Sequence, residues 1–169
     1  MVLRCTAKIL TLLGARPRDL VTIEPGDQDW YANLLWLDGR KCLLLAHAGT
    51  LFAIFVPDIR KPDLMPIGPY VVRFIHKELE AESFPLDRLG ALDSRSIALA
   101  KTESRTVLGY MNEMARFCEY AVGDAGGLAR CDALGAEPRA QEGTAPVPAA
   151  PGVHRSDRTG RRIPQPATA

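Results

Sequence analysis

The dipeptide Asp38-Gly39 constrains the fold more than any other sequence feature, because it separates two apolar runs of equal length, residues 31–37 and 40–46. Asp-Gly suits the two-residue type I′ turn, whose twist matches that of the strands it joins, so the pattern predicts a β-hairpin. A third apolar run, residues 51–56, follows after a short turn. We therefore expect an antiparallel β-meander over about residues 30–56.

Neither strand of this hairpin alternates apolar and polar residues. The first contains Leu34-Leu35-Trp36-Leu37 and the second contains Cys42-Leu43-Leu44-Leu45. Continuous apolar runs are typical of strands whose two faces are both covered. Because three strands cannot cover themselves, the sequence predicts an α+β fold in which three or four helices cover the meander and its edge strands.

Helical spacing and capping residues place the other elements along the chain. Thr6 and Gly14 suit the start and the end of a first helix. The remaining expected elements are edge strands at residues 2–5 and 96–101, and helices at about 69–82, at 84–92 and from Thr102 to about 122. The apolar residues of the last helix form one core-facing stripe: Val107, Leu108, Met111, Met114, Ala115, Cys118 and Val122.

The apolar periodicity stops near Leu134. Residues 135–169 contain six Pro, seven Ala and no aromatic residue, so this segment cannot offset the entropy of its own ordering. We predict one globular domain over residues 1–134 and a disordered tail over 135–169. Four arginines of the tail fall within residues 154–162, where they favour contact with nucleic acid or an acidic partner, or simply keep the chain soluble.

Several function classes are disfavoured by composition. The formal net charge is +1, which disfavours a nucleic-acid binder that relies on bulk basic charge. The four cysteines are widely spaced and form no C-x-x-C motif, and the sequence contains no Gly-rich phosphate loop. We therefore expect no metal and no cofactor. The most apolar stretch, Cys42 to Val56, has 15 residues and is interrupted by His47, Gly49 and Thr50, so it is too short to span a membrane; no signal peptide is evident. The expectation is a cytoplasmic protein with reduced thiols and no membrane partner.

The last helix also carries a polar face. Arg105, Gly109, Asn112 and Arg116 follow one another at i, i+4, i+7 and i+11, which places them within about 60° of each other. Two guanidinium groups and an amide beside a residue without a side chain suit the binding of a partner or an anion. The alternative is an ordinary solvated face. A glycine inside a helix costs about 1 kcal/mol relative to alanine, which favours a contact role for Gly109.

Three other positions are candidates for chemistry or binding. Lys101 precedes the helix whose first N–H groups could attract an anion, although capping and surface charge explain the same residues. Asn33 follows two aromatic residues in a segment that either stacks on a ligand or seals a core edge. His47, at the second turn of the meander, is the one candidate for acid–base catalysis; its alternative role is local hydrogen bonding in the turn.

Several of these segments together resemble a bacterial domain family of unknown function. They are Arg4-Cys5-Thr6, Trp30-Tyr31-Ala32-Asn33, His47-Ala48-Gly49-Thr50 and Arg105-Thr106-Val107-Leu108-Gly109-Tyr110-Met111-Asn112. The family consists of short single-domain proteins with W-x-A-N, R-x-C and R-S-V-x-G-x-M-N segments. The resemblance covers about residues 2–122 and implies no activity, substrate or cofactor.

Two hypotheses of function follow. In the first, the chain is a non-enzymatic binding or regulatory module that engages a protein or nucleic acid through the polar face of the last helix. In the second, it is a small enzyme acting on an anionic, phosphate-containing substrate, with His47 as acid–base and Lys101 and Arg105 holding the charge. The second hypothesis requires these three side chains to converge on one pocket.

Overall fold

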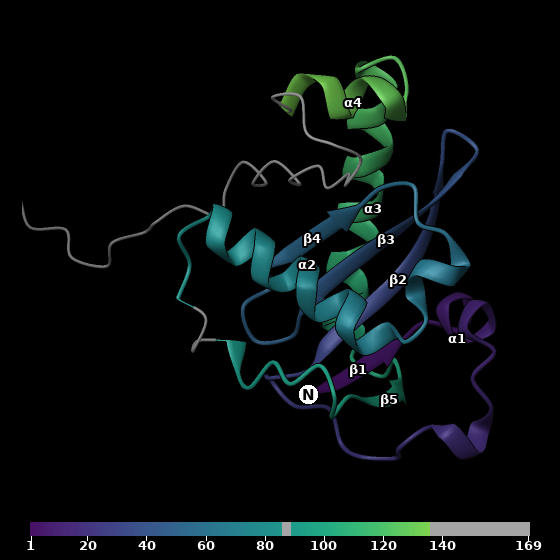
Figure 1. The fold of residues 1–169 in the computed structure, drawn as a ribbon, viewed down its shortest axis with the longest axis vertical. Coiled ribbons are helices and arrows are strands. Elements are labelled where there is room, and N and C mark those ends of the chain that lie inside the picture. The colour runs from purple at the N-terminus through teal and green to yellow at the C-terminus, as the bar shows by residue number, and fades with distance from the viewer. Residues whose placement is uncertain (86–88, 136–169) are drawn as a thin grey trace, which may run out of the picture.

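A computed structural model of the chain describes residues 1–85 and 89–135 (Figure 1). Five strands form one sheet in the order β4-β3-β2-β1-β5. The strands are β1 (Val2–Cys5), β2 (Trp30–Leu37), β3 (Arg40–His47), β4 (Ala53–Val56) and β5 (Ala98–Lys101). The helices are α1 (Ala7–Leu13), α2 (Ile67–Ala81), α3 (Arg105–Asp124) and α4 (Leu128–Gly135), with 3₁₀ turns at Pro17–Asp19 and Lys61–Leu64. The α+β fold class is thereby confirmed.

The antiparallel meander is present as expected, formed by β2, β3 and β4. Asp38 and Gly39 adopt φ angles of 50° and 72°, the left-handed values that a type I′ turn requires at both central positions. The register that this turn sets runs from Leu37 opposite Arg40 to Trp30 opposite His47.

The first strand differs from the prediction in its place within the sheet. We expected β1 at an edge, but it lies between β2 and β5 and is parallel to both. Parallel neighbours are joined by long crossovers, so nothing local in the sequence of so short a strand identifies its partners. The sheet is therefore mixed.

Helices cover both faces of the sheet, with α2 in front of it and α3 behind it in Figure 1. Alternate residues of the central strands enter two separate cores. Trp30, Leu43 and Leu45 pack on the side of α2, whereas Tyr31 and Leu44 pack on the side of α3. This arrangement explains why the strands lack an apolar–polar alternation.

Other details of the helices confirm or correct the sequence analysis. Gly14 closes α1 in the left-handed conformation (φ 71°), as expected. The N-cap of α3 is Ser104 rather than Thr102: its side chain accepts a hydrogen bond from the Val107 N–H at 3.4 Å. Of the helix expected over residues 84–92, the described residues show only Leu89 in 3₁₀ conformation, while residues 84–85 and 90–92 are not helical.

The helix α4 was not foreseen, because a glycine-rich turn follows α3 and the segment beyond it is short. The tail predicted over 135–169 lies almost wholly outside the described residues, so it stays a prediction, as does the domain boundary. Within residues 1–85 and 89–135, no helix is both long and apolar enough to cross a membrane.

Candidate functional site

The candidate site is the side of α3 that points away from the sheet, called here the outer face of α3. Arg105, Gly109, Asn112 and Arg116 all lie on it and are all exposed. The opposite side of the helix carries the stripe expected for the core, with Val107, Met111, Met114, Cys118 and Val122 buried against β2, β3 and β4. A period of 3.6 residues separates the two faces.

Gly109 has no packing role among the residues that the structure describes. A Cβ atom built at this position would meet none of their heavy atoms within 4 Å, and its backbone is not in the left-handed region. Glycine in a helix interior costs about 1 kcal/mol relative to alanine because of its backbone freedom. Neither intramolecular packing nor backbone conformation therefore accounts for the glycine.

The charges of this face are mixed. Arg116 Nη1 lies 3.3 Å from Glu113 Oε1, and both side chains are more than 70% exposed, so this pair contributes little stability. Within the described part of the chain, Arg105 and Glu119 have no ion-pair partner. Both are exposed. The outer face of α3 thus offers two charges of opposite sign that no described residue pairs.

Lys101 lies just before α3, at the end of β5, and is exposed. Its carbonyl accepts a hydrogen bond from Arg4 Nη1 at 3.3 Å. The carboxylate of Glu103 lies 3.8 Å from the same Nη1. Glu103, which lies between Lys101 and Arg105 in sequence, thus adds a negative charge to the segment that we expected to attract an anion.

Asn33 is half-buried in β2 and faces the segment that links β1 to α1. Its Oδ1 accepts a hydrogen bond from the Thr6 hydroxyl at 3.1 Å, and the Thr6 N–H donates to the neighbouring Ala32 carbonyl at 3.0 Å. Asn33 therefore positions the entry to α1. This contact also explains why the Thr6 side chain does not cap that helix.

His47 is fully buried at the end of β3. Its Nδ1 accepts from the Thr50 N–H at 3.3 Å and lies 3.0 Å from the Thr50 hydroxyl, whose oxygen accepts from the Phe52 N–H at 3.2 Å. Within the described residues, Nε2 of the same ring is buried and has no hydrogen-bond partner. Burial lowers the pKa of His47, while the nearby Asp27 and Asp29 act in the opposite direction.

The structure does not bring His47 together with the cations. The imidazole packs against the Trp30 ring, with ring centroids 5.2 Å apart, on the side of the sheet that α2 covers. Arg105 is exposed on α3, beyond the other side of the sheet. Arg105, Asn112 and Arg116 lie on one helix face, whereas Asn33 and His47 lie elsewhere.

A buried ion pair is the feature that the sequence analysis missed. Arg4 is fully buried in β1, and its Nε lies 2.6 Å from Asp29 Oδ2. Its Nη2 also donates to the Ile23 carbonyl at 2.8 Å. Because Arg4 also reaches Lys101, the guanidinium ties together the loop before β2 and the end of β5. The sequence does contain one signal of this buried pair, which is the presence of an arginine inside a short apolar strand.

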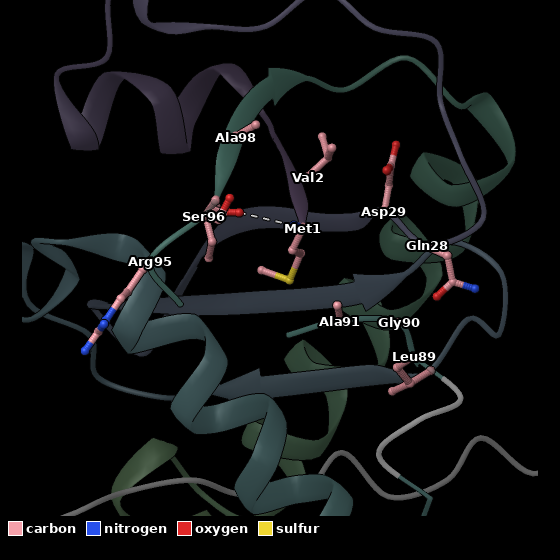
Figure 2. A pocket seen from close by; sticks show the side chains of 11 residues that line it. Met1, Val2, Gln28, Asp29, Leu89, Gly90, Ala91, Arg95, Ser96 and Ala98 are labelled. Atoms are coloured by element: carbon pink, nitrogen blue, oxygen red, sulfur yellow. Dashed lines mark hydrogen bonds between the residues drawn. The ribbon is translucent and has the colours of Figure 1, made fainter. Parts of the chain in front are cut away.

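A hollow of about 520 Å³ lies elsewhere, at the edge where β1 and β5 begin (Figure 2). Met1 lies at its centre, and its amino group donates to the Ser96 carbonyl at 3.2 Å. Arg95 and Gln28 lie on opposite sides of the hollow. Asp29 lines it, but Asp29 Oδ2 already accepts from Arg4 and from the Gly26 N–H. None of the residues predicted as site residues lines this hollow.

Metal and thiol chemistry receive no support within the described residues. They contain no group of three or more His, Cys, Asp or Glu side chains that could hold a metal ion. Burial raises the pKa of Cys5 and of Cys118 to about 12, and it raises that of Cys42 as well. These thiols stay protonated at neutral pH and are poor nucleophiles.

Comparison with known proteins gives one family and no relative of known activity. Residues 2–142 match the sequence model of the family described as Domain of unknown function (DUF6933). Neither the curated proteins nor the solved structures contain a significant match.

Proposed function

Since the chain belongs to the DUF6933 family of unknown function, we propose its function from its own geometry: it is a non-enzymatic binding or regulatory module that engages a protein through the outer face of α3. Gly109 carries the proposal. It is an exposed helical glycine that has no packing or conformational role within residues 1–85 and 89–135. A partner whose atoms approach the helix backbone closely would account for it.

The mixed charge of this face favours a protein partner over a nucleic acid. Arg105 and Arg116 are offset by Glu113 and Glu119 on the same helix, so the face has no excess of positive charge. Binding to a phosphate backbone depends on such an excess, since its affinity comes from neutralising phosphates. Protein interfaces, in contrast, often place charges of both signs around close contacts.

The alternative of a small phosphate-processing enzyme has weaker support. It needs His47 within hydrogen-bond reach of a substrate that Lys101 and Arg105 also hold. His47 is fully buried on the side of α2 and Arg105 is exposed on α3. We therefore retain the binding module as the conclusion.

Affinity capture with single variants tests this proposal. Arg105→Ala and Asn112→Ala remove exposed side chains and should leave the melting temperature within about 2 °C of the parent, since surface substitutions change stability by less than about 0.5 kcal/mol. Each should reduce the recovery of a specific partner protein. Arg18→Ala, at a 73% exposed arginine in the loop after α1, is the matched control and should not. Equal recovery of every partner by all three variants would contradict the proposal.

A further inference from the structure

The outer face of α3 continues beyond the four residues that first defined it. Glu119 and Gly123 extend the row, so that the successive spacings are four, three, four, three and four residues from Arg105 onwards. All six residues of the row are exposed. Alternating spacings of three and four are those of the a and d positions of a coiled coil, which face a partner helix along a seam.

Both glycines of this row leave open space. At Gly123, as at Gly109, no heavy atom of the described part of the chain lies within 4 Å of a built Cβ. The two lie about 21 Å apart along the helix, at 1.5 Å per residue. The row therefore combines four polar side chains with two glycines, at which a second helix could approach the backbone closely.

The row is complementary to itself in the antiparallel direction. When two antiparallel helices pack, an a position of one faces a d position of the other. A two-fold axis level with Met114 then sets Arg105 opposite the partner's Gly123, Glu119 opposite the partner's Gly109, and Asn112 opposite the partner's Arg116. Each of the two longest unpaired side chains meets a glycine.

The charges agree with the same register. Arg105 and Glu119 have no ion-pair partner within the described residues. In the antiparallel arrangement, Arg105 lies within one helical turn of the partner's Glu119, and the symmetry repeats this pair at the other end. Tyr120, which is 73% exposed beside the row, adds apolar area.

We infer that the partner of the outer face of α3 is the same face of a second copy of this chain, packed antiparallel about a two-fold axis. The inference rests on the proposed function and names its partner. The polar seam makes association weak and concentration-dependent, because polar a and d residues reduce the stability of helix pairs.

Sedimentation of the full chain over a wide concentration range tests this arrangement. The parent should change from monomer to dimer as its concentration rises. Arg105→Glu and Glu119→Arg should each weaken the dimer about 100-fold, since each sets like charges against each other at two symmetric places. The double variant should recover most of the lost affinity, because it restores both pairs with exchanged signs.

Two further variants sharpen the test. Gly109→Leu places a large side chain where Glu119 of the partner subunit would lie, so it should abolish the dimer without affecting the fold. Arg18→Glu, a charge reversal remote from α3, should leave dimerisation unchanged. A parent that stays monomeric at all concentrations, or a double variant as weak as the single ones, would overturn the inference. If such a monomer still captures a different protein through Arg105, the binding module stands and only the second copy is excluded.

Discussion

The carboxylate of Asp38 accepts a hydrogen bond from the backbone N–H of Leu128 at 3.0 Å, across 90 residues of sequence. Asp38 is part of the β2–β3 turn, and Leu128 is the first residue of α4. The first N–H groups of a helix have no partner within it, and a carboxylate both accepts from them and interacts favourably with the helix dipole. The turn that sets the hairpin register thus also holds α4.

Substitution of Asp38 should separate these two roles. Asp38→Gly keeps the positive φ but removes the acceptor, so it should destabilise the protein by about 1 kcal/mol, the usual value of a helix cap. Asp38→Ala should cost more, because alanine also disfavours the left-handed conformation. Asp38→Asn should be close to the parent, since asparagine tolerates that conformation and retains an acceptor oxygen. Urea unfolding of the three variants checks this order, and an Asp38→Gly protein as stable as the parent would contradict it.

Two glycines should respond to alanine in opposite ways. Gly109→Ala should stabilise the protein by about 0.5 to 1 kcal/mol, because the helix gains propensity and the added methyl group meets open space. Gly68→Ala should destabilise it, because the methyl group would overlap the carbonyl oxygen of Ser94 where α2 packs against the following loop. Thermal unfolding of both proteins gives the signs, and Gly123→Ala should behave as Gly109→Ala does.

The ion pair between Arg4 and Asp29 makes a third prediction. Asp29→Ala would remove the closer of the two carboxylates near a fully buried guanidinium, and breaking a buried pair typically costs about 3 to 5 kcal/mol. Asp29→Asn keeps a neutral acceptor and should cost less. Arg40→Ala, which removes an exposed pair with Asp58, should cost less than about 1 kcal/mol and serves as the comparison. Similar losses for Asp29→Ala and Arg40→Ala in denaturant unfolding would show that burial does not govern the cost.

Short-range patterns predicted the parts of this fold that depend on neighbours in sequence. The type I′ turn at Asp38-Gly39, the left-handed Gly14 and the stripe of α3 all follow from local conformational preferences and periodicity. The central place of β1 and the formation of α4 depend on contacts between distant residues, such as Asp38 with Leu128. No local pattern encodes them.

In the candidate site, too, the properties that follow from local spacing were predictable and those that depend on distant contacts were not. The exposure of Arg105, Asn112 and Arg116 follows from helical spacing alone and was predicted correctly. The position of His47 on the α2 side of the sheet follows from the register of β3, and its burial follows from the packing of the adjacent turn. Both depend on contacts that form only when the chain folds, so the sequence pattern did not predict them. Arg4 was overlooked because its partner, Asp29, is remote in sequence.

Acid should destabilise the protein through His47, whose pKa is lowered by burial. Above about pH 6.5, the ordinary histidine pKa, the side chain is neutral in both the folded and the unfolded state, so it makes no pH-dependent contribution. Below that pH the unfolded chain binds the proton more readily, so the free energy of unfolding falls as the pH falls towards the lowered pKa of the folded state. Urea unfolding between pH 8 and pH 5 should show this slope, and His47→Gln should reduce it, whatever its effect on stability at pH 8. His76→Gln, at a half-buried histidine of α2, should retain the slope. If His47→Gln and the parent lose stability equally over this range, the buried imidazole is not its source.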